Sequence, residues 1–243
     1  MAKTIIITGG SRGIGRATAL LCGAEGWNVA INYASNAEAA ESAVAAVIAA
    51  GGKAFAMQGD VRDEAAMIAL FDQTAQTYGG IDGVVSNAGI VAPKSTVAEM
   101  DVQRMRRVFD TNVLGAYIVA REAARRMTRG GSIVNLSSAA ARLGSAFEYV
   151  DYAGSKGAVD TMTTGLAAEL APQGIRVNAV RPGLIDTDIH ASGGQPDRAE
   201  RIGSKTPLGR AGTAEEVAQT IIWLLSDKAS YVTGAFVDVS GGR

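Results

Sequence analysis

Apolar runs rich in valine and isoleucine alternate with helical patterns from one end of the 243-residue chain to the other. Most of these runs are continuous, which is typical of strands that are covered on both faces. Strand–helix–strand repetition favours parallel strands joined by right-handed crossovers, so the sequence predicts a doubly wound α/β sheet of about seven strands. We expect one domain over residues 1–243. The predicted strands are residues 3–8, 28–33, 53–58, 81–86, 131–137, 176–180 and 235–239.

Segments with helical periodicity lie between the strands, and four of them are followed by a glycine that suits a left-handed helix end. One segment, residues 183–212, has no regular pattern and contains several glycines and prolines. A long irregular stretch inside a compact domain is usually functional, so we predict a substrate lid there. The predicted helices are residues 14–25, 37–50, 64–78, 102–127, 152–171 and 214–225, and the glycines are Gly26, Gly51, Gly79 and Gly174.

The composition excludes several classes of protein. A formal net charge of −1 gives no basic surface for nucleic acid. No apolar run approaches the ~20 residues of a membrane span, and the chain enters a strand directly after Met-Ala-Lys, so we expect a cytoplasmic protein. Cys22 is the only cysteine and is expected to pack inside a helix. His190 is the only histidine, which argues against zinc and against a Ser-His-Asp triad, and we expect no metal.

The first predicted strand runs directly into Thr8-Gly9-Gly10-Ser11-Arg12-Gly13-Ile14-Gly15, and a helix follows at once. Glycines at such a turn let the backbone approach a pyrophosphate, which then lies at the positive end of the helix dipole. The spacing differs from GxGxxG, and no Lys-Ser/Thr follows as in a P-loop. A plain tight turn is the alternative. Because the turn opens the first crossover, we predict a Rossmann-type dinucleotide site made of Gly9, Ser11, Arg12, Gly13, Ile14 and Gly15.

The end of the second predicted strand indicates which cofactor binds. An NAD site usually places Asp or Glu there to hold the ribose hydroxyls. Here Tyr33, Ser35 and Asn36 occupy the region and no acid is present. A 2′-phosphate therefore meets no carboxylate, and Arg12 is available as a cation. We predict NADP(H) as the preferred cofactor, with NAD possible; the alternative for Arg12 is a solvated loop residue.

Tyr152 and Lys156 stand four residues apart at the start of a predicted helix, and so share one helical face. A neighbouring ammonium favours the phenolate and lowers the tyrosine pKa toward a range useful for general acid–base work. By itself such a pair is common on solvated helices. Ser138, however, follows the strand 131–137, whose carboxyl end is where ligands bind in a doubly wound sheet. Its hydroxyl can donate to a substrate oxygen that gains negative charge.

Together these features resemble the short-chain dehydrogenase/reductase family over essentially the whole chain. No single motif is decisive, but their order and separation are specific. The C-terminal stretch from Pro207 to Arg243 is also similar, and the chain looks closest to sugar-alcohol and glucose dehydrogenase-like members. The matching motifs are Thr8-Gly9-x-x-x-Gly13-x-Gly15, Asp60-Val61, Asn87-Ala88-Gly89, Asn112, Ser138, Tyr152-x-x-x-Lys156 and Pro182-Gly183-x-x-x-Thr187.

The resemblance implies a role for each catalytic position. Tyr152 would be the general acid in reduction and the base in oxidation. Lys156 would lower the pKa of Tyr152 and bind the nicotinamide ribose. Ser138 would polarise the carbonyl, and Asn112 would hold a water leading from Lys156. Family members commonly have the serine thirteen residues before the tyrosine, whereas Ser138 lies fourteen before it; we attribute this to one extra residue within 143–151, which leaves Ser137 as a weaker candidate.

The resemblance also implies cofactor contacts. Asp60 would accept from the adenine amino group with Val61 stacking nearby, and Asn87, Ala88 and Gly89 would pack against the adenosine. Ile185 and Thr187, in the motif that begins with Pro182 and Gly183, would hold the nicotinamide end. Simpler structural roles are an N-cap for Asp60 and a C-terminal turn for Asn87-Ala88-Gly89.

The predicted function is therefore an NADP(H)-dependent oxidoreductase that interconverts a carbonyl and a secondary alcohol. Family members of this size imply a homotetramer or homodimer. Glu148, Asp151 and His190 would add polarity that suits a hydroxylated or sugar-like substrate. A 3-oxoacyl thioester reductase is the competing enzyme, and a catalytically idle NADP-binding regulatory protein is the alternative of another class. The intact set Asn112, Ser138, Tyr152 and Lys156 argues against the idle protein.

Overall fold

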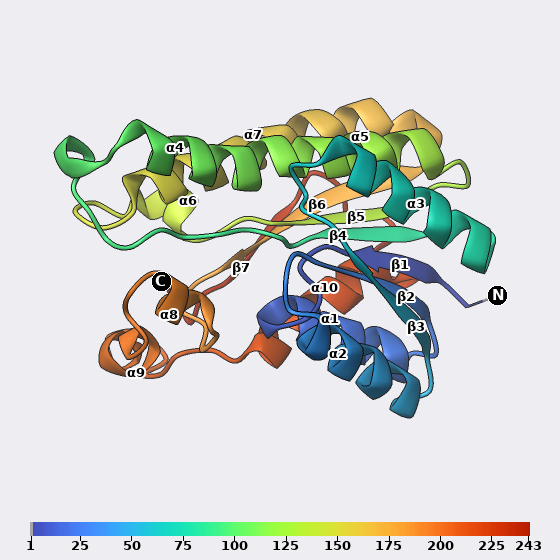
Figure 1. Ribbon diagram of the computed structural model, residues 1–243, viewed down its shortest axis with the longest axis horizontal. Helices are drawn as coiled ribbons and strands as arrows, with labels where there is room; N and C mark the ends of the chain where they lie inside the picture. Colours follow the sequence, from blue (N-terminus) through green and yellow to red (C-terminus); the bar gives the residue numbers. More distant parts are fainter. Residues whose placement is uncertain (1) are drawn as a thin grey trace.

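The computed structural model describes residues 2–243, which form a single domain around one sheet of parallel strands (Figure 1). The strands are β1 (Thr4–Ile7), β2 (Asn28–Tyr33), β3 (Lys53–Gln58), β4 (Gly83–Ser86), β5 (Gly131–Leu136), β6 (Ile175–Pro182) and β7 (Phe236–Val239). Their order across the sheet is β3-β2-β1-β4-β5-β6-β7. The chain thus moves outward from β1 in one direction and restarts at β4 in the other. The predicted doubly wound α/β fold is confirmed.

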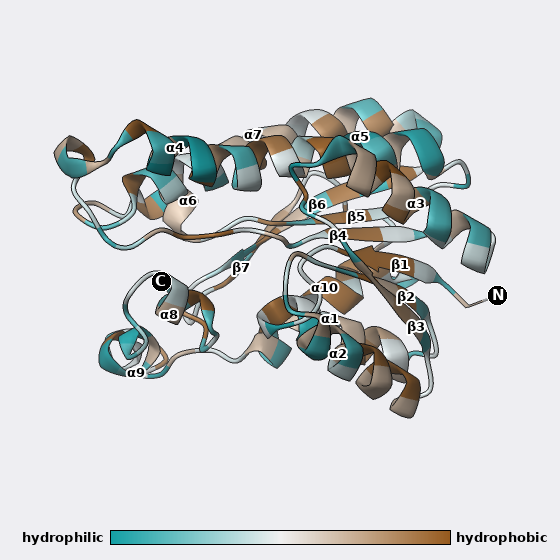
Figure 2. Ribbon diagram, in the orientation of Figure 1, coloured by the Kyte–Doolittle hydropathy of each residue, from teal (hydrophilic) through white to brown (hydrophobic). Residues whose placement is uncertain are grey.

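Helices cover both faces of the sheet (Figure 1). One face carries α1 (Gly13–Ala24), α2 (Ala37–Ala49) and α10 (Ala214–Leu225); the other carries α3 (Glu64–Tyr78), α4 (Val102–Phe109), α5 (Gly115–Arg126) and α7 (Val150–Leu170). Because side chains alternate along a strand, Ile5 and Ile7 enter the first core and Ile6 enters the second. Figure 2 shows the resulting apolar strands between helices whose outer surfaces are more polar.

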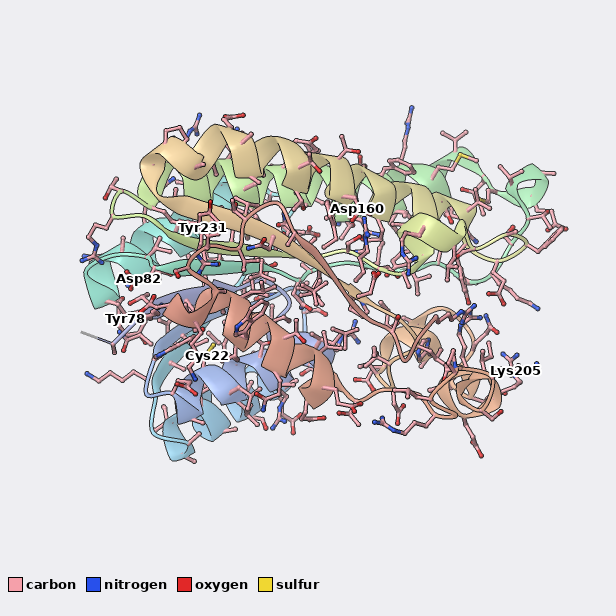
Figure 3. The ribbon with its side chains drawn as sticks, turned by 180° about the vertical axis from the view of Figure 1, so that it is seen from behind. Cys22, Tyr78, Asp82, Asp160, Lys205 and Tyr231 are labelled. Carbon is pink, nitrogen blue, oxygen red and sulfur yellow. The ribbon has the colours of Figure 1, made fainter. Side chains whose placement is uncertain are left out.

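The local signals of the sequence act as expected at the helix ends. The four glycines predicted to end helices, Gly26, Gly51, Gly79 and Gly174, all have positive φ, between 71° and 109°. Cys22 is fully buried in α1, where burial raises the pKa of its thiol (Figure 3). Within residues 2–243, no helix is long and apolar enough to cross a bilayer.

The helix predicted over residues 102–127 is interrupted. α4 passes into a π-helical turn, η2 (Asp110–Leu114), before α5 begins, and the amide of Gly115 bonds to the carbonyl of Asp110. The widened turn brings Gly115 close to Val61, because a Cβ added at Gly115 would lie 2.7 Å from Val61 Cγ2. A π-helical turn differs from an α-helical turn by only about one residue. The pattern of apolar residues over 102–127 is therefore shifted only slightly, and the sequence does not show the interruption.

The segment 183–212 is more regular than the sequence indicates, since it contains α8 (Ile189–Ser192) and α9 (Arg198–Gly203). Other boundaries agree to within one or two residues, as is usual at the ends of elements. The remaining short elements are η1 (Val97–Glu99), α6 (Ala140–Leu143), η3 (Ala171–Gln173) and η4 (Asp227–Ala229).

Candidate active site

The loops that follow β1, β4, β5 and β6 meet at the carboxyl edge of the sheet, because parallel strands all end on that side. The glycine loop follows β1, residues 87–89 follow β4, residues 137–138 follow β5, and the 183–212 segment follows β6. β1 and β4 flank the point where the strand order reverses. In open α/β sheets this is where ligands bind, and every motif of the sequence analysis lies at or near it.

Thr8 and Asn87 join the glycine loop to the loop after β4. The Thr8 hydroxyl accepts from the backbone amides of Asn87 at 3.0 Å and Ala88 at 3.1 Å. In return, the Asn87 side-chain amide donates to the carbonyls of Thr8 at 2.9 Å and Gly9 at 3.0 Å. Asn87 therefore has a structural task as well as its predicted place beside the cofactor.

The glycine loop fits a pyrophosphate. Gly9 and Gly13 have φ of 62° and 53°, and a Cβ at Gly15 would lie 2.4 Å from the Gly9 carbonyl oxygen. Arg12, the N-cap of α1, makes no side-chain cap, and the first turn of α1 contains no acid. The first amides of α1 are therefore not capped by a side chain, and the positive end of the helix is available to an anion.

The residues predicted to select the cofactor lie around the ends of β1 and β2. Arg12 and Ser35 are exposed, and Tyr33 is partly buried at the end of β2. Asn36 caps α2, because its side-chain oxygen accepts from the amide of Ala39 at 2.9 Å. The cap uses the oxygen of Asn36, which leaves its amide group as a donor.

Asp60 and Val61 are arranged differently from the simpler alternatives. Asp60 does not cap α3; Asp63 does, by accepting from the amides of Ala65 and Ala66. Asp60 pairs instead with Arg62 at 2.6 Å, and this guanidinium holds the pKa of Asp60 below its usual value. The Val61 side chain is only 5% exposed and belongs to the core. Their contacts with adenine stay predictions.

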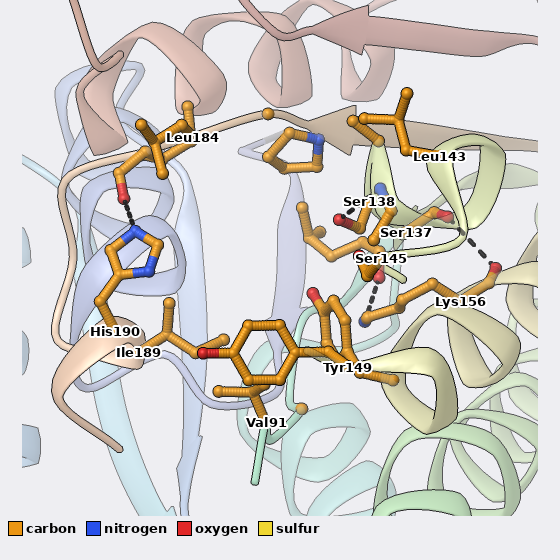
Figure 4. A pocket seen from close by; sticks show the side chains of 18 of the residues that line it. Val91, Ser137, Ser138, Leu143, Ser145, Tyr149, Lys156, Leu184, Ile189 and His190 are labelled. Atoms are coloured by element: carbon orange, nitrogen blue, oxygen red, sulfur yellow. Dashed lines mark hydrogen bonds between the residues drawn. The ribbon is translucent and has the colours of Figure 1, made fainter. Parts of the chain in front are cut away.

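Ser138 follows β5 and Lys156 lies in the second turn of α7 (Figure 4). Tyr152, one turn earlier in α7, lines the same cavity. Lys156 is buried and its Nζ donates to the carbonyl of Leu136 at 2.6 Å. The same Nζ lies 5.8 Å from the centroid of the Tyr152 ring. Ser138 lies beside Tyr152 in the cavity and acts to lower the tyrosine pKa. A serine hydroxyl, a phenol and an ammonium thus lie together in one cavity.

Burial dominates the electrostatics of this site. It raises the pKa of Tyr152, and the hydrogen bond from Ser138 opposes that rise. Burial also lowers the pKa of Lys156 to about 8, with the Asp160 carboxylate acting in the other direction. Lys156 donates its short hydrogen bond to the carbonyl of Leu136, and its expected effect on the tyrosine pKa stays a prediction.

The two adjacent serines have different tasks. Ser137 is 4% exposed, and its hydroxyl donates to the carbonyl of Lys156 at 3.3 Å. Ser138 is less buried, accepts from the amide of Ala140 at 3.1 Å, and reaches Tyr152. The geometry favours Ser138 as the group facing the substrate.

Asn112 lies in the π-helical turn η2 and is buried. Its side-chain oxygen accepts from the amide of Ile90 at 2.8 Å, while its amide donates to the Ile90 carbonyl at 2.9 Å and to Ser155 Oγ at 3.1 Å. A Cβ at Gly89 would lie 3.3 Å from Asn112 Oδ1 and 3.4 Å from Lys156 Nζ. Asn112 therefore fixes the loop after β4 beside Lys156, and its water-holding role stays a prediction.

A cavity of about 440 Å³ unites the two halves of the predicted site (Figure 4). It brings seven of the predicted cofactor residues to the same space as Ser138, Tyr152 and Lys156. The predicted cofactor residues that do not line it are Gly9, Ser11, Arg12, Gly13, Gly15, Tyr33, Ser35, Asn36, Asp60, Val61 and Ala88, and the predicted catalytic residue Asn112 does not line it either. The seven lining residues are Ile14, Asn87, Gly89, Pro182, Gly183, Ile185 and Thr187.

The expected polar substrate residues divide into two groups. Glu148 and His190 line the cavity; His190 Nε2 is bonded to the Ile185 carbonyl at 2.8 Å, and burial lowers the histidine pKa. Asp151 does not contribute, which corrects the expectation. It is 7% exposed and forms a buried ion pair with Arg104 at 2.8 Å, while its other oxygen accepts from the Tyr152 amide.

The loop before α7 is strained. Ser145 and Phe147 have φ of 47° and 64°, a region that side chains other than glycine rarely occupy. The Phe147 side chain is 82% exposed, whereas Tyr149, two residues later, is buried and lines the cavity. This bend lies within residues 143–151, the stretch in which the sequence analysis places one extra residue, and that placement stays a prediction.

Sequence reasoning missed much of the cavity wall. Apolar side chains supply most of it, and they come from loops without periodic patterns. Arg198 lies inside the predicted lid but was not singled out, because its position carries no signal of its own. The lining residues that belong to no predicted motif or segment include Val91, Ala139, Ala140 and Arg243.

Comparisons with known proteins agree with this geometry. A family model described as Enoyl-(Acyl carrier protein) reductase matches residues 9–243. The uncharacterized oxidoreductase YgfF of Escherichia coli K12 is 54% identical, over 98% of each chain. L-rhamnose 1-dehydrogenase (NAD(P)(+)) of a Sphingomonas species is 40% identical, over 99% of this chain and 95% of that protein.

A solved structure extends the likeness to three dimensions. The short chain dehydrogenase of Burkholderia cenocepacia J2315, in complex with NADP, has a TM-score of 0.92 at 34% identity and covers 99% of this chain and 97% of its own. The family model and these relatives match nearly the whole length of the chain, and the sheet order and the positions of the motifs are consistent with them. The chain is an NAD(P)-dependent oxidoreductase that belongs to the short-chain dehydrogenase/reductase family.

Proposed function

We propose that the protein interconverts a carbonyl compound and a secondary alcohol with NADP(H), and that Tyr152 is its general acid and base. The observation that carries the proposal is the single cavity lined by Ser138, Tyr152 and Lys156 together with the residues after β1, β4 and β6. A proton donor, a hydrogen-bond donor and a cation thus border one space beside a loop that fits a pyrophosphate.

In this mechanism the side chains prepare and protonate the carbonyl oxygen. When bound, the dihydronicotinamide supplies the hydride to the carbonyl carbon. Ser138 donates a hydrogen bond to the oxygen, on which negative charge develops. Tyr152 transfers its phenolic proton to that oxygen and is left as the phenolate. Lys156 stabilises the phenolate, and a pKa of about 8 keeps it largely protonated at neutral pH.

Preference for NADP(H) has two supports. The end of β2 presents Tyr33 and Ser35 and no carboxylate, and Arg12 is exposed in the adjacent glycine loop. The solved relative named above is itself bound to NADP. A charge-assisted hydrogen bond from Arg12 to the 2′-phosphate corresponds to roughly 1.5–3 kcal/mol. This favours NADP over NAD by about tenfold to a hundredfold.

A 3-oxoacyl thioester reductase is the second candidate, because the 3-oxoacyl-[acyl-carrier-protein] reductase FabG of Staphylococcus aureus is 38% identical over 100% of this chain. The rhamnose dehydrogenase relative favours a hydroxylated substrate instead. Incubation with NADPH and a panel of simple ketones, hydroxylated aldehydes and 3-oxoacyl thioesters, followed by absorbance, separates the two. If NADPH absorbance stays constant with every compound of the panel, the idle regulatory protein is favoured.

Tyr152→Phe tests the assignment of the proton donor. The variant should keep NADPH affinity, because the ring remains, and lose turnover on the order of 10²-fold or more. Near-wild-type kcat in a variant that binds NADPH normally would show that another group supplies the proton.

Segment 183–212 is proposed as the substrate lid, since Leu184, Ile189, His190 and Arg198 all line the cavity.

We also infer a homo-oligomer, a dimer or tetramer, because Phe109, Tyr117 and Val150 expose apolar side chains on α4, α5 and α7. Light scattering gives the size of the assembly. The cytoplasmic location stays a prediction.

A further inference from the structure

Glu148 and Arg198 form one wall of the substrate cavity. Arg198 Nη1 and Nη2 donate to Glu148 Oε1 at 2.9 Å and Oε2 at 2.7 Å, so the pair is bidentate. Their side chains are 12% exposed for Arg198 and 29% for Glu148. Both line the same cavity as Ser138 and Tyr152. This ion pair is therefore partly buried and borders the space that also contains Ser138 and Tyr152.

The pair is held in place from three segments. The backbone carbonyl of Glu148 accepts from the amide of Ser95 at 3.0 Å, which ties it to the loop after β4. The Arg198 guanidinium lies 5.2 Å from the ring centroid of Tyr149. The Tyr149 hydroxyl in turn accepts a hydrogen bond from Gln195 in the lid segment. These contacts limit how far either charge can turn away from its partner.

A satisfied ion pair discriminates by charge. An anionic substrate group placed here must displace the Glu148 carboxylate from Arg198 or lie beside it unpaired, and both are unfavourable in a partly buried wall. An uncharged group requires neither. His190 is bonded to the Ile185 carbonyl and burial lowers its pKa, so it adds no fixed positive charge at neutral pH. Two other cations line the cavity: Lys156, which donates to the Leu136 carbonyl, and Arg243, which is exposed. Both are unchanged in variants of Glu148 and Arg198, so a comparison among those variants isolates the effect of the pair.

We propose that the Glu148–Arg198 pair is the specificity determinant that makes this cavity select uncharged carbonyl substrates over those with a carboxylate or phosphate. The inference rests on the proposed carbonyl reduction and deepens it. Either residue alone would leave a buried charge that recruits the opposite charge. Together they present hydrogen-bonding edges without net charge, and selection against anions follows from their mutual pairing.

The test uses two substrates that differ only in charge: the ethyl ester of a short 3-oxo acid and the free acid. The quantity measured is the ratio of kcat/KM for the acid to kcat/KM for the ester, with NADPH. The wild type should favour the ester. Glu148→Gln frees the Arg198 guanidinium and should raise the acid-to-ester ratio about tenfold or more, which corresponds to ~1.4 kcal/mol.

Further variants make the cause unambiguous. Arg198→Gln leaves the Glu148 carboxylate unpaired and should lower the ratio below that of the wild type. The double variant Glu148→Gln/Arg198→Gln has no free charge and should return close to it. Glu216→Gln is the matched control, because Glu216 forms a similar bidentate pair with Arg210 on the exposed surface away from the cavity. Its ratio should equal that of the wild type.

Three results would overturn the inference while carbonyl reduction itself stands: a wild type that prefers the acid, an unchanged ratio in Glu148→Gln, or a double variant as high as the single one. The first would mean that the pair opens to receive an anion. If the wild type reduces neither substrate nor any member of the carbonyl panel, the proposed function fails, and the inference fails with it.

Discussion

Removal of the Ser138 hydroxyl is expected to damage catalysis without damaging the fold. In Ser138→Ala the cavity loses the hydroxyl that would donate to the substrate oxygen. Loss of one such donor costs about 2.7–4 kcal/mol of transition-state stabilisation, or about 10²–10³ in kcat. The folded state loses only the contact with the Ala140 amide, at 3.1 Å, worth about 0.5–1.5 kcal/mol.

Ser137→Ala is the matched comparison, one residue away. It also removes a single hydrogen bond, from a buried hydroxyl to the Lys156 carbonyl at 3.3 Å, so its loss of stability should be similar. Its kcat should fall less than about tenfold, because this hydroxyl already donates to the backbone. Initial rates of NADPH oxidation and thermal melts of both variants give the two quantities. A larger loss of kcat/KM in Ser137→Ala would refute the assignment and place the extra loop residue elsewhere.

Three further predictions follow from charges. Lys156→Met should abolish turnover yet stabilise the protein near pH 7 by up to about 3 kcal/mol, because burial lowers the lysine pKa from 10.5 to about 8. The unfolded chain binds more protons between these values, so wild-type stability rises there with pH and the advantage disappears above about pH 10; a variant less stable at every pH contradicts this. Arg12→Ala should weaken NADPH more than NADH, and Tyr33→Asp should favour NADH; equal weakening of both cofactors in titrations would leave Arg12 a general loop cation. Asp151→Asn removes one partner of the buried pair with Arg104 and should cost about 3–5 kcal/mol in denaturant unfolding; a cost below about 1 kcal/mol would show that the pair is hydrated.

The fold was predictable because its signals are local. The run Ile5-Ile6-Ile7 indicates a strand buried on both faces, and each isoleucine is fully buried. Tyr152 and Lys156 were predictable for a similar reason, since four residues of helix fix their relation. The π-helical turn at Asp110–Leu114 was not predictable from the sequence. It goes together with hydrogen bonds from Asn112 to Ile90 and Ser155, which are distant in the sequence.

The errors at the site also concern partners that are distant in sequence. Asp151 seemed available to a substrate because it precedes Tyr152, yet Arg104, 47 positions away, pairs with it inside the protein. Arg198 pairs with Glu148 across 50 positions. Neither arginine belongs to a motif, and a sequence shows the charge of a residue without showing which charge it meets.

The bend at Ser145 and Phe147 has a consequence for how this enzyme can change. Left-handed backbone at residues other than glycine costs on the order of 1 kcal/mol or more each, so the loop before Glu148 is held at the expense of heat resistance. Asparagine tolerates this backbone better, and Phe147→Asn would relax it and remove an exposed ring. Selection for thermostability and selection for new substrates therefore act on the same few positions, and a lineage that gains one property there will readily alter the other.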